Sequence, residues 1–142
     1  MMKNRVILIL SFVFGCSNNS DYNPSIELKS PNDDFVSRIY IDMWGGSAGG
    51  VEYIVNVQKK LEQANSDKNI VFKTSKEGKI CIDWLDEKNL KISTNLNSHI
   101  SVKKKILYLD DKKIYIKYSD IANLKNCINL QNNQTKFDIN KN

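Results

Sequence analysis

Short runs of β-branched and aromatic residues, separated by turn residues, constrain the fold of this chain most strongly. Alternation is clearest where Val51, Tyr53, Val55 and Val57 fall on one face. The runs cover residues 35–42, 51–57, 69–74, 80–84, 90–94, 105–109 and 113–118. This length and spacing predict an all-β domain, mainly antiparallel, built as a sandwich or a meander.

Four other segments carry signals for a helix, a turn or a tail. Residues 51–64 also fit a helix, although their Val, Ile and Tyr content favours a strand for the first half. Asp110-Asp111-Lys112 predicts the turn of a hairpin. Ser119 is a suitable N-cap for a short C-terminal helix over residues 119–124. Residues 131–142 are polar and are expected to form a tail.

The N-terminus has the pattern of an export signal. Lys3 and Arg5 precede an apolar run, Val6–Phe14, which is too short to span a bilayer as a permanent helix. A polar segment begins directly after Cys16. We therefore expect a signal peptide at 1–15, a polar tether at 16–30, a β-rich domain at 31–130 and the polar tail at 131–142.

Val13-Phe14-Gly15-Cys16 resembles the lipobox of bacterial lipoproteins. The resemblance implies that Cys16 becomes an acylated mature N-terminus, with palmitate-type chains, and that the membrane is a partner through this lipid. The protein would then be lipid-anchored in the cell envelope. In a Gram-negative host, Ser17 after the cysteine implies the outer membrane, facing the periplasm. The alternative is a plain signal peptide with an incidental cysteine.

Three stretches resemble a family of small exported bacterial domains of unknown function. They are the opening Ser30–Tyr40, the glycine loop Gly45–Gly50 and the segment Ile82–Ile92, which is similar to the family's VxWxDNxxLxI hairpin. The resemblance implies a β-rich fold, frequent lipoprotein status and no established activity.

Charge and cysteine content narrow the function classes. The chain of 142 residues has a formal charge of +5, and removal of residues 1–15 with Lys3 and Arg5 leaves +3. Basic residues show no arginine cluster and no aromatic–basic platform, so we expect no nucleic-acid partner. One histidine leaves little material for a metal site, and we expect no metal and no cofactor. After Cys16, an even pair remains: Cys81 and Cys127 form either a disulfide or two buried thiols.

The glycine loop is the candidate binding loop. It lies beside an aromatic residue and comprises Trp44, Gly45, Gly46, Ser47, Gly49 and Gly50. Its Gly-x-Ser-x-Gly spacing also matches a nucleophile elbow, with Asp83 and His99 in the order of a hydrolase triad. The elbow needs a strand, turn and helix in a large α/β sheet, so a Ser47 hydrolase is the minor alternative and we expect no catalysis. His99 is expected at the surface.

Together these features predict a non-catalytic, membrane-anchored envelope lipoprotein that acts as a binding or interaction module. The second hypothesis is an immunity or inhibitor lipoprotein that neutralises an envelope-acting toxin or hydrolase, with an envelope protein as partner. Lys103-Lys104-Lys105 is either a solvated turn or a patch for anionic lipid headgroups.

Overall fold

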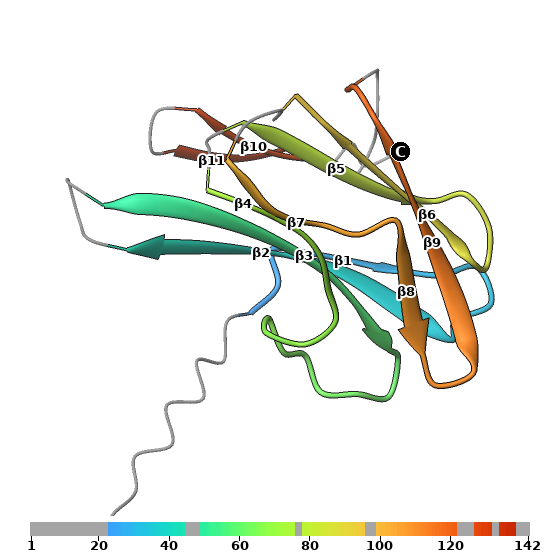
Figure 1. Cartoon of the computed structure of the whole chain (residues 1–142). Coiled ribbons are helices and arrows are strands. Elements are labelled where there is room, and N and C mark those ends of the chain that lie inside the picture. Colours follow the sequence, from blue (N-terminus) through green and yellow to red (C-terminus); the bar gives the residue numbers. More distant parts are fainter. Residues whose placement is uncertain are drawn as a thin grey trace, which may run out of the picture.

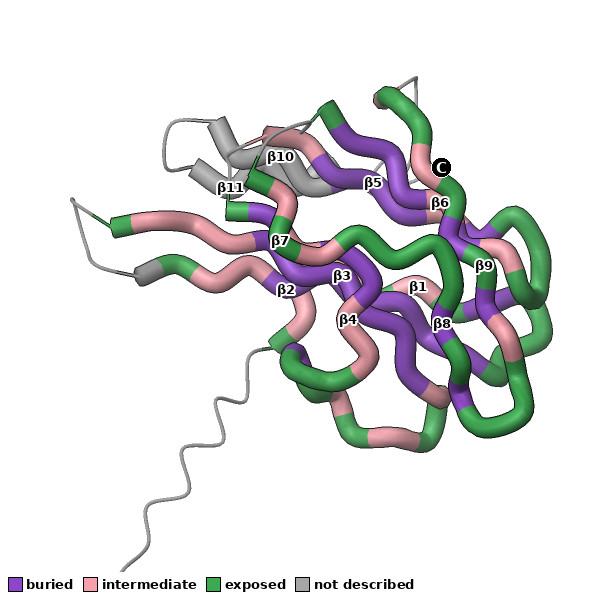
Figure 2. The backbone as a smooth tube through the Cα atoms, viewed as in Figure 1, coloured by how far each residue is buried: buried purple, intermediate pink, exposed green. Residues whose placement is uncertain are grey.

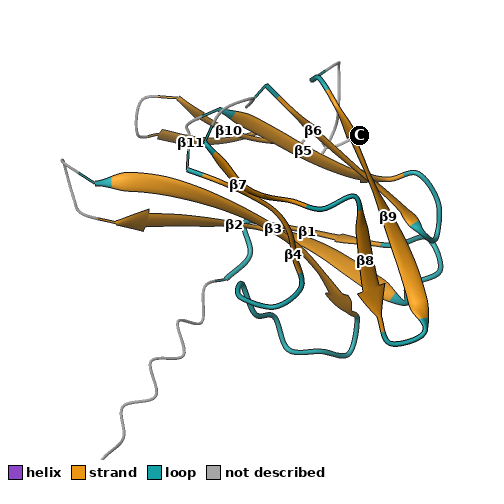
Figure 3. Cartoon of the chain, viewed as in Figure 1, coloured by secondary structure: helices purple, strands orange, loops and turns teal. Residues whose placement is uncertain are grey.

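The described part of the chain consists of β-strands joined by loops and turns, with no helix among the described residues (Figures 1 and 3). A computed structural model describes residues 23–44, 49–75, 78–95, 99–121, 127–131 and 134–138. The strands are β1 (Ile26–Lys29), β2 (Phe35–Trp44), β3 (Gly50–Lys59), β4 (Ile70–Thr74), β5 (Lys79–Trp84), β6 (Asn89–Thr94), β7 (Ile100–Lys103), β8 (Ile106–Leu109), β9 (Lys112–Ser119), β10 (Cys127–Gln131) and β11 (Gln134–Asp138).

Two sheets face each other in a sandwich-like arrangement. The first has the order β1-β2-β3-β4-β7, and the second has the order β11-β10-β5-β6-β9-β8. Among the described strands, every pair is antiparallel except β6 with β9, which run parallel. The predicted all-β, mainly antiparallel fold class is therefore confirmed. The parallel pairing of β6 with β9 was not predicted.

The core lies between the two sheets (Figure 2). The first sheet contributes Tyr53, Val55 and Val57, the face that the alternation in β3 predicted. The second sheet contributes Ile80, Ile82 and Trp84 from β5, together with Leu90 and Ile92 from β6 and the inner residues of β8 and β9. The period-2 pattern is thus explained, because alternate side chains of a strand point to opposite faces of the sheet.

The two sheets are also joined by polar contacts through the core. The Trp84 indole donates a hydrogen bond to the Leu28 carbonyl at 3.2 Å, and the Trp84 ring stacks on Phe35 with centroids 6.5 Å apart. The Tyr53 hydroxyl donates to the Gly78 carbonyl at 3.1 Å. These large side chains each find a partner for their polar atom, as buried Trp and Tyr require.

Several predicted boundaries differ from the structure. Strand β1 lies within the predicted tether, because Ile26 and Leu28 pack against the core while Glu27 pairs with Arg38 of β2. The helical alternative for residues 51–64 is wrong, since the chain stays extended to Lys59. In place of a tail from residue 131, residues 134–138 form β11, paired with β10.

The predicted C-terminal helix lies partly outside the described residues. Ser119, its expected N-cap, is the last residue of β9, and residues 122–126 lie outside the described residues.

A disulfide joins Cys81 of β5 to Cys127 of β10. The two cysteines are direct cross-strand partners, with Cα atoms 4.1 Å apart, and both are buried. Of the two alternatives for this cysteine pair, a disulfide or two buried thiols, the structure has the disulfide. The disulfide ties β10, and with it the neighbouring β11, to the centre of the second sheet.

Candidate functional site

A groove of about 400 Å³ opens at the end of the sandwich where β2 begins and β3 ends. Three chain segments that are distant in sequence line it, namely residues 33–35, 59–61 and 109–112. The first two segments come from the sheet of β2 and β3, and the third is the turn between β8 and β9. A volume of this size is in the range of small-ligand sites.

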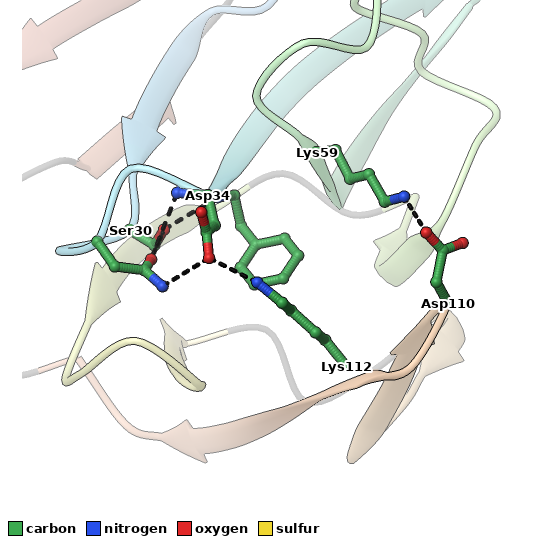
Figure 4. A network of polar contacts seen from close by, with 7 residues as sticks. Ser30, Asp34, Lys59, Asp110 and Lys112 are labelled. Atoms are coloured by element: carbon green, nitrogen blue, oxygen red, sulfur yellow. Dashed lines mark hydrogen bonds and ion pairs between the residues drawn. The ribbon is translucent and has the colours of Figure 1, made fainter.

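A compact turn builds the first wall of the groove (Figure 4). The Ser30 hydroxyl donates to Asn32 Oδ1 at 2.8 Å and accepts from the Phe35 amide at 3.0 Å. Asn32 Nδ2 in turn donates to Asp34 Oδ2 at 2.9 Å. Asp33 has a φ of 61°, in the left-handed region that Asp and Asn tolerate better than most residues. This turn fixes the Asp34 carboxylate at the groove.

Ion pairs join the two sheets across the groove (Figure 4). Lys112 of β9 donates to Asp34 Oδ2 at 2.6 Å, and its ammonium lies 5.4 Å from the Phe35 ring centroid. Lys59 of β3 pairs with Asp110 of the β8–β9 turn. Both pairs therefore connect the first sheet to the second at this end of the molecule.

A third ion pair joins the segment at residues 59–61 to the turn at residues 33–35. Lys60 binds the Asp33 carboxylate, and the pKa of Asp33 is lowered chiefly by this hydrogen bond. The pKa values of Lys59 and Lys112 are raised, in each case chiefly by the bond to the carboxylate partner. Asp33, Lys59 and Lys112 therefore stay charged across the neutral range.

The exposure of these ion pairs makes them exchangeable. Side chains of the Lys59–Asp110 pair are 42% and 68% exposed, and those of Lys112–Asp34 are 47% and 44% exposed. Exposed pairs of this kind contribute about 0–1 kcal/mol each, so a ligand that offers equivalent partners can replace them at little cost.

Charge and apolar surface alternate along the groove. Its lining has four carboxylates, on Asp33, Asp34, Asp110 and Asp111, and three ammonium groups, on Lys59, Lys60 and Lys112. Leu61 is 95% exposed beside them, while Phe35 and Leu109 are buried at the base. The groove therefore presents groups of both charges, together with apolar surface, to a ligand.

A second polar cluster lies on the outer face of β2 and β3. Arg38, 4% exposed, donates through Nε to Glu27 at 2.7 Å and through Nη1 to Gln58 Oε1 at 2.8 Å. Asn56 and Tyr40 are buried on the same face, and burial raises the pKa of the Tyr40 hydroxyl. The segment between β3 and β4 is bonded to this face, since Asn56 Nδ2 donates to the Asn65 carbonyl at 2.6 Å. This cluster holds the β3–β4 segment on the outer face of the sheet.

The predicted binding loop and lipidation site fall largely outside the described residues. Cys16 and residues 45–48, which include Gly45, Gly46 and Ser47, are not described. The backbone of Trp44 ends β2, and Gly50 opposes it at the start of β3. Gly49 is exposed. The groove lies at the opposite end of the β2–β3 pair, where Phe35 opposes Lys59.

His99 lies at the surface, as expected. It is exposed, with a φ of 60°, and its carbonyl accepts from the Ser75 amide at 3.3 Å and from the Thr74 hydroxyl at 3.2 Å. Lys103-Lys104-Lys105 is exposed as well, and the Lys103 ammonium lies 4.8 Å from the Tyr118 ring centroid.

Comparisons with protein-family models, curated proteins and solved structures found no match for the chain. Among the described residues, no three His, Cys, Asp or Glu side chains gather closely enough to hold a metal ion. No helix in that part of the chain is long and apolar enough to cross a membrane.

Sequence reasoning did not identify the groove. Its signals were present as separate turn motifs, Asn32-Asp33-Asp34 and Asp110-Asp111, and as the Lys59-Lys60 pair. Each motif alone is typical of a solvated turn. Only the pairing of β2 with β3 and the packing of the β8–β9 turn against them bring the three together.

Proposed function

We propose that this protein is a lipid-anchored, non-catalytic binding module of the bacterial cell envelope, whose ligand site is the charged groove. The anchor rests on the residues around Cys16, where an apolar run ends in Gly-Cys and a polar segment follows. The observation that carries the binding role is the groove itself, where exposed ion pairs surround an apolar base.

The distance from anchor to domain supports action close to the membrane. Ile26, where β1 begins, lies ten positions after Cys16 in the sequence. A fully extended chain of that length reaches about 35 Å, so an acylated Cys16 would hold the start of β1 within that distance of the bilayer. A ligand of the groove would then be a component of the envelope, such as a partner protein.

The charges indicate the class of ligand. Lys59, Lys60 and Lys112 each have a carboxylate partner, whereas the Asp111 carboxylate forms no ion pair within the described residues. A cationic group on the ligand would bind Asp111, and an anionic group would exchange with a carboxylate on one of the lysines. An extended peptide segment with basic, apolar and acidic side chains has this chemistry.

Binding is tested with a capped Lys-Leu-Asp tripeptide as the probe. We expect saturable NMR shift changes in the millimolar range for residues 33–34, 59–61 and 110–112. Asp111→Asn and Lys112→Gln should each weaken the binding at least threefold, whereas the matched control Asp67→Asn, in the exposed β3–β4 segment, should leave it unchanged. Uniform shifts that do not saturate, or equal effects of all three variants, would exclude the groove as the site.

A further inference from the structure

Among the strands that the structure describes, β8 lies at the edge of its sheet and has no strand paired to its outer side. It is the last strand of its sheet and pairs with β9 through the register Ile106 with Tyr115 and Leu109 with Lys112 (Figure 1). Leu107 and Leu109 are buried in the core, whereas Ile106 and Tyr108 are 37% and 66% exposed. An exposed edge with apolar side chains is a template for pairing with another strand.

The geometry of the β8–β9 turn determines which backbone N–H and C=O groups of β8 point toward β9. Leu109 and Lys112 flank a two-residue turn, and the Ile116 amide donates to the Lys105 carbonyl at 2.8 Å. Alternation in an antiparallel pair therefore directs the N–H and C=O groups of Leu107 and Leu109 toward β9. Those of Ile106 and Tyr108 point away from β9, to the open side of the sheet.

The charges that flank β8 are complementary to those of a second strand that has the same sequence and runs in the opposite direction. Lys103, Lys104 and Lys105 precede it, and Asp110 and Asp111 follow it. An acidic surface would satisfy the lysines but would be repelled by the aspartates. A strand running the other way with the same sequence satisfies both ends.

We propose that β8 pairs antiparallel with β8 of a second copy of this chain, with Leu107 opposite Leu107. This register places Ile106 opposite Tyr108 of the second copy, so the outward N–H and C=O groups of both residues form four hydrogen bonds. It also keeps the exposed side chains on one face and places Lys104 opposite Asp110 of the other copy. Asp110 can take part because its side chain is 68% exposed beside Lys59.

The size of the contact makes this a weak and reversible association. Only four residues form β8, and a stable interface buries about 1,200–2,000 Å² in total. The pairing is therefore expected to form where the protein is concentrated.

Cysteine cross-linking of the full chain tests the register directly. Residues opposite each other in a hydrogen-bonded antiparallel pair have Cα atoms about 5.5 Å apart, within the range of a disulfide. We expect a mixture of Ile106→Cys and Tyr108→Cys chains, under mild oxidation, to give at least five times more disulfide-linked dimer than either variant alone. Lys68→Cys, in the exposed β3–β4 segment, measures random collision.

Two further variants separate edge pairing from loss of fold. Tyr108→Pro removes an N–H that points away from β9, and Lys104→Glu reverses one flanking charge. Lys104→Glu, combined with the cysteine pair, should lower the dimer yield several-fold, whereas Lys68→Glu should not. Circular dichroism checks that each variant is folded, and Tyr108→Pro should abolish the concentration dependence of the sedimentation coefficient. Equal yields from the mixture, the single variants and Lys68→Cys would overturn the proposal.

Discussion

Reduction of the Cys81–Cys127 disulfide should destabilise this domain strongly. The bridge joins residues 46 apart in sequence. On the loop-entropy model, a cross-link that closes such a loop contributes about 4 kcal/mol to the free energy of unfolding. Strand β10 pairs with β5 only from Cys127 to Asn129, so few other bonds hold it in place.

Urea unfolding of the full chain, followed by tryptophan fluorescence, measures this contribution. Trp84 lies on the same strand as Cys81, in the core, and reports the loss of its surroundings. We expect the free energy of unfolding to fall by about 3–4 kcal/mol on reduction, with the larger value if β10 and β11 unfold together with the rest. The double variant Cys81→Ala/Cys127→Ala is the control, since reductant should leave its stability unchanged.

The result that refutes this reasoning is specific. If reduction changes the free energy of unfolding by less than about 1 kcal/mol, the bridge does not constrain the unfolded chain as the loop-entropy model requires. Hydrogen exchange then tells whether β10 leaves β5 on its own: in that case the amides of residues 127–131 lose protection while those of β6 keep it.

Three further predictions concern single side chains. Arg38→Met should cost about 2–3 kcal/mol in urea unfolding, because it removes the buried partner of Glu27 and one of the two donors to Gln58 Oε1, the other being the Asn65 amide. An equal cost for Glu27→Gln would contradict this, since the Glu27 side chain is 41% exposed, against 5% for Arg38. Trp84→Phe should cost about 0.5–1.5 kcal/mol, because the Leu28 carbonyl loses the indole donor and keeps the Ser37 hydroxyl, and an unchanged urea midpoint would argue against the indole bond. The pKa of Asp86 is lowered, chiefly by hydrogen bonds from a neighbouring side-chain amide, so its stabilising effect is present above pH 4 and lost as pH falls through the lowered value. The stability difference between the native chain and Asp86→Asn should therefore shrink from pH 5 to pH 2, and a constant difference would show that the carboxylate charge has no part in it.

The sequence predicted those strands that bury one face in the core. Residues 51–57 and 80–84 alternate between apolar and polar, and both became central strands because the alternate side chains pack between the sheets. Turn chemistry also predicted the hairpin at Asp110-Asp111, where Asp110 has a φ of 53°. These features depend on residues close together in the chain.

Features that depend on distant partners were not predicted. Residues 134–138 read Gln-Thr-Lys-Phe-Asp, with too little apolar alternation to indicate a strand, and they are extended because β10 lies beside them. In turn, β10 is positioned by β5 and by the disulfide at Cys127. The groove also depends on residues that are distant in sequence, since its walls come from three turns that meet only in the folded sandwich.

The intact mass of the protein isolated from the membranes of its host tests the central claim most directly. The account predicts a chain that starts at Cys16 and carries acyl chains, with a gain of about two mass units on reduction of the disulfide. A mass that starts at another residue and includes no lipid would contradict it, because nothing would then hold the groove near the membrane.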